Sequence, residues 1–299
     1  MLEVTIWYKQ ASMFLLKAMV LFNTLLMLKR WIMYFLKWVV YLAITTFLST
    51  PILAKDIIIG GTGNALGTMT LLAQEYQRSN PETEITVLPS IGSSGAIKAV
   101  PLGKIHLGLS SRPFKETEFT GGATAVEYAR SPTVIAVSNK LTENAITVEQ
   151  LIQIYTGELT QWSTGELIRP IIRQANDGNT KQLNQLSPKL KKALAMGNEN
   201  PDFLFAATDQ ESVSHIEKVP GSFGVTTLAL ILSENRNIHA MSLDGVDPTH
   251  ASNAKRYPMN TSFYFIIPKA IPPHVADFLD FVSSSEGKAI LEKYGNYAP

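Results

Sequence analysis

The sequence predicts an α/β protein with a parallel sheet and crossover helices, and three observations lead to this fold class. From Lys55 onward, short apolar runs alternate with longer segments in which apolar residues recur every three or four positions. The short runs are typical of buried strands and the longer segments of amphipathic helices. Glycine or proline ends most of them, and this alternation along the chain indicates a layered α/β fold.

The first part of this region is expected to contain three strands and two helices. The strands are "DIIIGG", "EITVLPS" and "IHLGLSS". Between the first two, "TMTLLAQEYQRSNP" repeats apolar residues at helical spacing from Met69 to Tyr76 and stops before Pro81. Between the last two, "SSGAIKAVPLG" predicts a short helix that is broken near Pro101.

The second part alternates in the same way. "SPTVIAVSN" predicts a strand, and "ITVEQLIQIYTG" predicts a helix whose first residues, Thr147 and Gln150, can form a capping box. "IRPIIRQANDGNTKQLNQLSPKLKKALAM" predicts a strand, a polar turn and a helix, and "PGSFGVTTLALI" a further strand and helix. The strand "SFYFIIP" and two helices in "HVADFLDFVSSSEGKAILEKYG" complete the pattern, and no repeat of fixed period is present.

Residues 1–54 differ from this body and are expected to direct export. Basic residues precede an apolar run from Trp38 to Leu48, and small residues then end at Ala54. This order is the pattern of a signal peptide that is cleaved just before Lys55. The body is therefore expected to leave the cytoplasm and, without a cysteine for a lipid anchor, to be free in the periplasm.

Two features of this segment leave an alternative open. A second apolar stretch at residues 13–28 is more than one signal peptide needs, so the true start could lie at Met27 or Met33. Alternatively, residues 31–48 form an uncleaved membrane anchor, since Lys37 is the single charge in these 18 positions.

Composition excludes several classes of function. The chain has 299 residues, of which 45% are hydrophobic and 17% charged, enough for two domains. It has no cysteine, which excludes disulfides, thiolate metal sites and a cysteine nucleophile. Residues 1–54 hold five of the 26 basic and one of the 25 acidic residues, so the body has a net charge of −3. This mildly acidic body argues against nucleic-acid binding.

Three turns share one design, in which a strand ends, small polar residues follow and a helix begins. They are Gly60–Gly67 ("GGTGNALG"), Ser90–Ala96 ("SIGSSGA") and Asn176–Lys181 ("NDGNTK"). Unpaired N–H groups at a helix N-terminus bind anions, and glycine lets a ligand approach the backbone closely. Ser, Thr and Asn also cap ordinary helices, but three such turns in one chain favour a shared oxyanion site.

Familiar catalytic and cofactor motifs do not fit. "GGTGNALG" lacks the third glycine at the dinucleotide spacing and the Lys-Ser/Thr of a nucleotide-binding loop, and "GSSG" is not a nucleophile elbow. The five histidines have no metal-binding spacing, and His106 on an apolar strand is expected to be a packing residue. The sequence therefore predicts no catalytic residue, no metal site and no cofactor.

Two arginines follow predicted strands beside the polar turns. Arg112 comes after the second of two Ser-Ser pairs, and Arg173 precedes the third turn. The planar guanidinium suits bidentate contacts with oxyanions. The competing interpretation for each is an ordinary surface or ion-paired arginine.

These residues resemble the phosphate-binding proteins of ABC phosphate transporters, the PstS-like group of periplasmic substrate-binding proteins. The resemblance covers most of residues 55–299 and follows the order of the family's segments. The segments that carry it are "GGTGNALG", "SIGSSGAIKAVPLGKIHLGLSSRP", "ITVEQLIQIYTGELTQW", "RQANDGNTK", "PGSFGV", "YPMNTSFYFIIP" and "FLDFVSSSEGKAILEKYG".

The resemblance implies a two-lobed, type II-like periplasmic-binding-protein fold. Each lobe would be a sheet flanked by helices, with two crossover strands joining them and the ligand in the cleft. Lobe 1 would comprise residues 55–136 and 258–299, and lobe 2 residues 137–257. By position, the implied ligand contacts are Thr62, Gly63, Asn64, Ala65, Ser93, Ser94, Gly95, Ser110, Ser111 and Arg112 from lobe 1, and Arg173, Asp177, Gly178, Asn179 and Thr180 from lobe 2.

The sequence departs from the family pattern at three places. Asn64 replaces a common hydroxyl residue, and "DGNT" follows Arg173 one residue later than expected. Ser111 stands where some members carry an aspartate. A carboxylate accepts the proton of hydrogen phosphate and repels sulfate, whereas a serine repels neither anion.

The sequence thus predicts a non-enzymatic, monomeric, exported protein that captures phosphate for an inner-membrane ABC permease. One alternative is a binding protein for another oxyanion, such as sulfate, tungstate or arsenate. A second is a membrane-tethered anion sensor that retains residues 31–48. A serine hydrolase built on Ser93 or Ser94 is disfavoured because the nucleophile elbow is missing.

Overall fold

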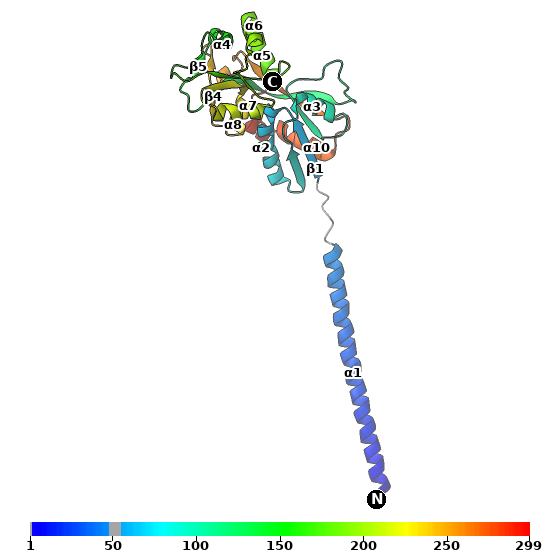
Figure 1. Ribbon diagram of the computed structural model, residues 1–299. Helices are drawn as coiled ribbons and strands as arrows, with labels where there is room; N and C mark the ends of the chain where they lie inside the picture. The colour runs from blue at the N-terminus through cyan, green and yellow to red at the C-terminus, as the bar shows by residue number, and fades with distance from the viewer. Residues whose placement is uncertain (1, 48–54) are drawn as a thin grey trace. The chain divides into compact units, whose positions relative to one another are not determined.

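The computed structural model describes residues 2–47 and 55–299, which belong to two separate compact units (Figure 1). The first unit is one helix, α1 (Leu2–Phe47). By length and composition alone its segment Met13–Val39 could cross a membrane, and signal sequences share these properties. The residues just before the predicted cleavage point at Lys55 lie outside the described residues.

The second unit is built on one mixed sheet, with nine strands among the described residues. Its order is β2-β1-β3-β11-β4-β8-β6-β7, and β9 pairs with β4. The strands are β1 (Lys55–Gly61), β2 (Thr83–Val87), β3 (Leu107–Ser110), β4 (Thr124–Ser138), β6 (Arg169–Ile172), β7 (Leu204–Phe205), β8 (Ser222–Thr227), β9 (Ile238–Ala240) and β11 (Asn260–Ile267). A separate parallel pair joins β5 (Ala145–Ile146) to β10 (Ser242–Leu243).

The predicted parallel strands are confirmed, but the centre of the sheet is antiparallel. β1 pairs in parallel with β2 and β3, and β6 does so with β7 and β8. Between these groups, β11 runs antiparallel to both β3 and β4. Strand β11 therefore returns from the end of the chain into the middle of the sheet, which local sequence patterns do not encode.

Strand β4 connects the two halves of the sheet and is longer than predicted. Its first half pairs with β11 up to Pro132, and from Thr133 it pairs with β8. The first half is only partly buried, so it lacks the continuous apolar run that marks the second half. At the change of partner, the Thr133 and Thr261 hydroxyls are hydrogen-bonded at 2.8 Å, and Gln182 Nε2 donates to Thr261 Oγ1 at 2.8 Å.

Ten helices are described in the second unit. They are α2 (Gly63–Ser79), α3 (Gly92–Ala99), α4 (Val148–Thr156), α5 (Gly178–Leu186), α6 (Pro188–Gly197), α7 (Asp209–Lys218), α8 (Leu228–Ser233), α9 (Ala251–Ala254), α10 (Pro273–Ser283) and α11 (Ser285–Lys293). Figure 1 shows α4, α5 and α6 gathered at one end of the unit, and α2, β1 and α10 at the other.

Local capping explains where several helices start and stop. α4 has the predicted capping box between Thr147 and Gln150 and ends at Gly157, whose φ of 82° suits glycine. The predicted helix after residue 178 is in fact two helices, α5 and α6. Ser187 caps α6 by accepting from Leu190 N, and Pro188 fits the first turn of a new helix better than the interior of an old one.

Buried apolar side chains form separate cores on the two halves of the sheet. One core joins β4, β8 and α4, with Ile135, Phe223 and Leu151 fully buried. The other joins β1, α2 and α10, and a smaller cluster lies under α3. All of these cores lie within residues 55–299, so this unit has the buried apolar surface that a domain needs to fold alone. The lobe boundaries near residues 136 and 258 stay predictions.

Candidate anion-binding site

The three predicted polar turns are all helix starts that follow strands. α2 starts directly after β1, α3 follows β2, and α5 follows β6. Ser110 ends β3, the neighbour of β1. In open α/β sheets, ligands bind beyond the carboxyl ends of the strands, where these turns lie.

The two serine pairs are hydrogen-bonded to each other. Ser93 Oγ accepts from Ser111 N at 2.9 Å and lies 2.9 Å from Ser111 Oγ. The buried Ser110 hydroxyl donates to Arg112 O at 2.6 Å and accepts from Arg112 N at 3.2 Å. Ser110 therefore fixes the turn, while Ser111 presents its hydroxyl at the end of the strand.

The end of β3 lies close to the third turn. Ser111 Oγ lies 3.6 Å from the position that a Cβ on Gly178 would occupy. Gly178 is the first residue of α5. One predicted contact from each of the two predicted lobes is therefore adjacent to the other in this structure.

Arg112 is paired within its own turn. Its guanidinium makes a bidentate ion pair with Glu118 (2.8 and 2.7 Å) and donates to Ser94 Oγ at 3.1 Å. The hydrogen bonds from Arg112 are the main cause that lowers the pKa of Glu118 to about 2. Arg112 is therefore an ion-paired arginine, because Glu118 balances its charge. It contacts the predicted site residues through its hydrogen bond to Ser94.

Arg173 is buried beside the third predicted turn and has unused donors. Its Nη2 contacts Asp177 Oδ2 at 2.9 Å and Asp209 Oδ1 at 3.3 Å, and its side chain is 8% exposed. Its Nε and Nη1 are buried and have no hydrogen-bond partner in the described part of the chain. Unpaired buried donors are costly, so this pair is well suited to an oxyanion.

Asp177 already occupies the N-terminus of α5. Its Oδ1 accepts from Asn179 N at 3.0 Å and from Thr180 N at 3.3 Å, and its Oδ2 bonds to Arg173. The side chains of Asn179 and Thr180 are buried. The N–H groups expected to meet the anion here are thus capped by the protein's own carboxylate, and Gly178 remains the open part of this turn.

The N-terminus of α2 is packed against α7. Gln210 Nε2 donates to Gly63 O at 2.9 Å, and a Cβ on Gly63 would lie 2.8 Å from Asp209 Oδ2. Asn64 is buried, and its Oδ1 accepts from Thr227 Oγ1 at 3.2 Å. The backbone of Thr62 is fixed by a bond from its N–H to Leu109 O at 2.9 Å.

The two remaining predicted contacts have apolar surroundings. Ala65 belongs to the core beneath α2. Gly95 faces Ile91, whose side-chain carbons would lie 3.0–3.4 Å from a Cβ at that position. Both residues can offer a ligand only their backbone.

Asp209 is the site residue that the sequence did not reveal. It begins α7, is 5% exposed, and accepts from Asn179 Nδ2 at 3.3 Å in addition to its contact with Arg173. Burial raises the pKa of Asp209 to about 6, Arg173 opposes the increase and Asp177 adds to it. The spacing of Thr208 and Glu211 is a capping pattern and could have predicted α7.

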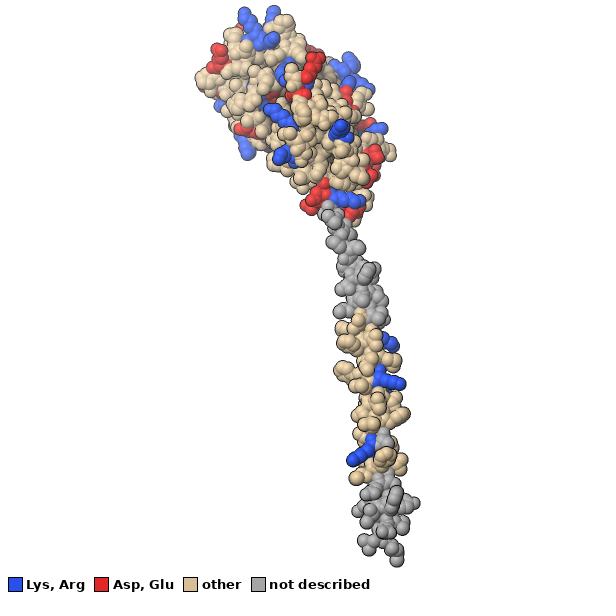
Figure 2. Space-filling view, turned by 90° about the vertical axis from the view of Figure 1, so that its right-hand side faces the viewer, with Lys and Arg blue, Asp and Glu red and all other residues tan. Residues whose placement is uncertain are grey.

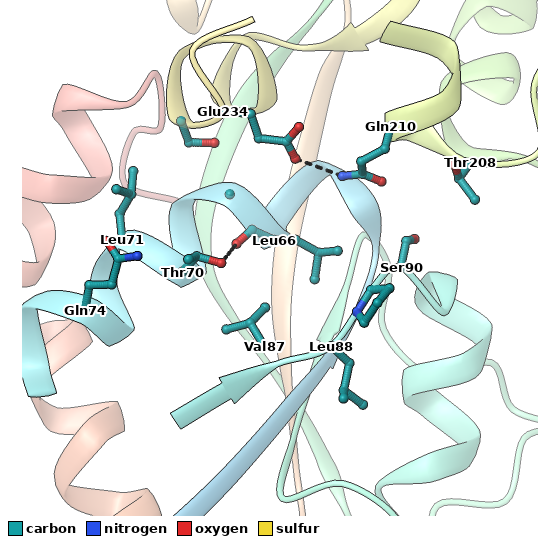
Figure 3. A pocket seen from close by; sticks show the side chains of 13 residues that line it. Leu66, Thr70, Leu71, Gln74, Val87, Leu88, Ser90, Thr208, Gln210 and Glu234 are labelled. Carbon is teal, nitrogen blue, oxygen red and sulfur yellow. Dashed lines mark hydrogen bonds between the residues drawn. The ribbon is translucent and has the colours of Figure 1, made fainter. Parts of the chain in front are cut away.

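A hollow of about 650 Å³ lies beside the α2 N-terminus (Figure 3). Leu66, Val87 and Leu88 provide apolar walls, and Gln210 hydrogen-bonds to Glu234 at its rim. Ser93, Ser111 and Arg173 do not line this hollow, so it is a neighbour of the site rather than the site itself.

On the face drawn in Figure 2, basic and acidic side chains of residues 55–299 are interspersed. Within residues 2–47 and 55–299, no group of His, Cys, Asp or Glu is arranged to hold a metal ion. His106 is partly buried and accepts from Ile58 N at 2.9 Å, as a packing residue would.

Comparisons with known proteins show the family to which this chain belongs. The model of the PBP superfamily domain matches residues 49–286. The phosphate-binding protein PstS of Borreliella burgdorferi is 24% identical over 250 residues, which cover 81% of this chain and 89% of that protein.

Two solved structures have a similar fold. One, from Clostridium perfringens, is described as a phosphate ABC transporter substrate-binding protein with bound phosphate. It has a TM-score of 0.66 and 21% identity, over 82% of this chain and all of that one. The other is an ABC-type phosphate transport receptor from Vibrio cholerae, with a TM-score of 0.55 and 22% identity, over 81% of this chain and all of that one.

Proposed function

Because the chain belongs to the PBP superfamily, we propose that it is a non-enzymatic solute-binding protein that captures phosphate for an ABC permease. The similar proteins from three bacteria are phosphate-binding or phosphate-transport proteins by name, which supports phosphate over other solutes. The observation that carries the proposal is Arg173, a buried cation with two unused donors beside the third predicted turn.

Phosphate would be held by neutral donors around this single cation. Arg173 Nε and Nη1 provide charge-assisted bonds, and Ser111 and Ser94 provide hydroxyls. Backbone N–H groups at the start of α3 and the N–H group of Gly178 complete the shell. Arg112 holds Ser94 in place rather than facing the ion with a free charge.

Entry of the ion requires the two lobes to separate. The space between Ser111 and Gly178 is about the size of one methyl group, since a Cβ on Gly178 would lie 3.6 Å from Ser111 Oγ. A phosphate ion does not fit into this space. Rotation about the β4–β11 pair would open this gap for phosphate and close the turns around it afterwards.

The proposed location is the periplasm, with residues 1–54 acting as the export signal. The apolar helix α1 is compatible with a signal peptide, and the protein is proposed to act there as a monomer. N-terminal sequencing of the exported protein tests this. A start near Lys55 supports a free protein, whereas retention of residues 31–48 supports the membrane-tethered alternative.

Calorimetric titration of residues 55–299 with phosphate, arsenate, sulfate and tungstate tests the ligand. Phosphate is expected to bind, and no heat with phosphate anywhere between pH 5 and 9 would refute the proposal. Tighter binding of another anion would favour the alternative that Ser111 leaves open.

The matched variants Arg173→Lys and Arg169→Lys test the site. Lysine keeps the charge but loses the planar donors, and each charge-assisted bond contributes about 1.5–3 kcal/mol. Arg173→Lys should therefore weaken phosphate binding at least about tenfold. Arg169, at the opposite end of β6, donates to Pro220 O and should tolerate the change. Equal affinities in the two variants would remove Arg173 from the site.

A further inference from the structure

The hollow beside α2 has the size and the walls of a small-molecule site (Figure 3). Its volume of about 650 Å³ lies within the range of ligand pockets, which are mostly apolar with a few polar groups. The apolar walls include Leu66, Val87 and Leu88, and Glu234 contributes a carboxylate. Arg173 does not line the hollow, which therefore lacks the cation of the proposed phosphate site.

Glu234 has the one charged side chain among the described residues that line the hollow. Its carboxylate is held in place, because Gln210 Nε2 donates to Glu234 Oε1 at 2.9 Å. The side chain also packs closely on α2, since a Cβ on Gly67 would lie 2.8 Å from Glu234 Cγ. The carboxylate is thus fixed beside the apolar walls before any ligand arrives.

The charge of Glu234 is not balanced by its neighbours. Arg236 Nη1 lies 3.7 Å from Glu234 Oε2, a distance too long for a hydrogen bond. The same guanidinium pairs more closely with Glu217, at 3.1 Å. With both carboxylates ionised, the cluster of Arg236, Glu217 and Glu234 has a net charge of −1. Glu234 Oε2 accepts no hydrogen bond from the described part of the chain, so it is an available acceptor on a charged group.

We propose that the hollow binds an aliphatic ammonium ion. The ammonium group donates to Glu234 Oε2, and its hydrocarbon chain lies along Leu66, Val87 and Leu88. This site goes beyond the proposed function and does not depend on it, because it holds a cation in a different part of the molecule.

Ligands that lack one of these two parts should bind less tightly. An alcohol of the same length contacts the apolar walls but leaves the charge of Glu234 without a cation. A fatty acid or an alkyl phosphate would place a second negative charge beside the carboxylate. An ammonium ion without a hydrocarbon chain would bury no apolar surface.

Titration of residues 55–299 with butyl-, pentyl- and hexylammonium chloride at pH 7 tests the site, with hexanol and hexanoate as controls. These amines are protonated at this pH, as lysine is. The affinity should rise about threefold to fourfold for each carbon that the walls bury. Hexylammonium should bind about threefold more tightly than hexanol, and this preference should shrink as salt is added. Equal affinities for hexylammonium and hexanol would overturn the proposal, and so would the absence of binding. Titration of the same sample with phosphate tests the proposed function separately.

The matched variants Glu234→Gln and Glu84→Gln assign the ammonium contact. Glu234→Gln keeps the shape of the side chain and should bind hexylammonium no better than hexanol. Glu84, on β2, is exposed and does not line the hollow, so Glu84→Gln should behave as the parent does. A preference for hexylammonium that survives in Glu234→Gln would refute the assignment. If Glu234→Gln does not fold, Val87→Thr decides the matter, because it should weaken the binding of both hexylammonium and hexanol.

Discussion

Replacing Gly63 by alanine should weaken ligand binding without weakening the fold. A Cβ at this position would lie 2.8 Å from Asp209 Oδ2 and 2.9 Å from Asp209 Cβ, and it would also meet Gln210 Oε1. Cβ atoms do not approach this closely, so the start of α7 must move away from the start of α2. Overpacking of this kind costs about 1–3 kcal/mol.

The predicted effect falls on closure because α2 and α7 belong to different proposed lobes. An open protein avoids the clash, so the cost appears as a loss of affinity of about fivefold to 150-fold. Unfolding by urea should show no loss of stability, and even a gain of up to about 1 kcal/mol, because alanine favours helices more than glycine.

Gly178→Ala is the matched comparison for this experiment. Gly178 is also the first residue of a helix. A Cβ on Gly178 would lie 3.6 Å from Ser111 Oγ, its nearest neighbour, which is an ordinary contact distance. Calorimetry should show a smaller loss of phosphate affinity for Gly178→Ala than for Gly63→Ala. Parental affinity in Gly63→Ala would show that the contact between α2 and α7 is absent from the bound state. A large loss of stability would show that this contact also holds the open protein together.

Three further predictions concern stability. Glu118→Gln should make stability depend less steeply on pH in acid. The lowered pKa of Glu118 stabilises the folded protein at neutral pH, and this contribution is lost as pH falls from about 4.5 to 2. An unchanged dependence of stability on pH would show that the ion pair with Arg112 contributes nothing. Thr147→Ala should cost about 1 kcal/mol in urea unfolding through loss of the α4 capping box and leave phosphate binding unchanged. As pH rises from 4 to 7, Asp209→Asn should gain stability relative to the parent, on the order of 2 kcal/mol. The raised pKa of Asp209, about 6, means that the parent loses stability between about pH 4 and 6, where the unfolded carboxyl ionises and the folded one stays protonated. Thermal melts across this range check the last prediction, and parallel curves for the two proteins would contradict it.

Features set by a few neighbouring residues were predictable from the sequence. The starts of α2, α3 and α5 follow from glycine and small polar residues after apolar runs, and the α4 box follows from Thr147 and Gln150. The place of β11 between β3 and β4 was not predictable, because it depends on pairing between distant segments. The split between α5 and α6 was missed although Pro188 signals it.

The site shows the same division between local and distant effects. The serine turns and Arg173 were named from their own segments, and the structure brings Ser111 close to Gly178. Asp209 was missed because its importance comes from a contact with Gly63, far away in the sequence. Asp177 was predicted to contact the ligand, but its carboxylate caps α5 and accepts from the N–H groups of Asn179 and Thr180.

The change of partner in β4 also has a mechanical meaning. Strand β4 runs from the half of the sheet that contains β11 into the half that contains β8, so its change of partner marks the line about which the proposed lobes would rotate. Gln182 of α5 is bonded to Thr261 at this line, so the helix that carries the third turn is tied directly to the axis. In the proposed two-lobed mechanism, movement of this turn by a small ion would rotate one proposed lobe against the other. A partner that docks on both proposed lobes would sense that rotation without touching the ion.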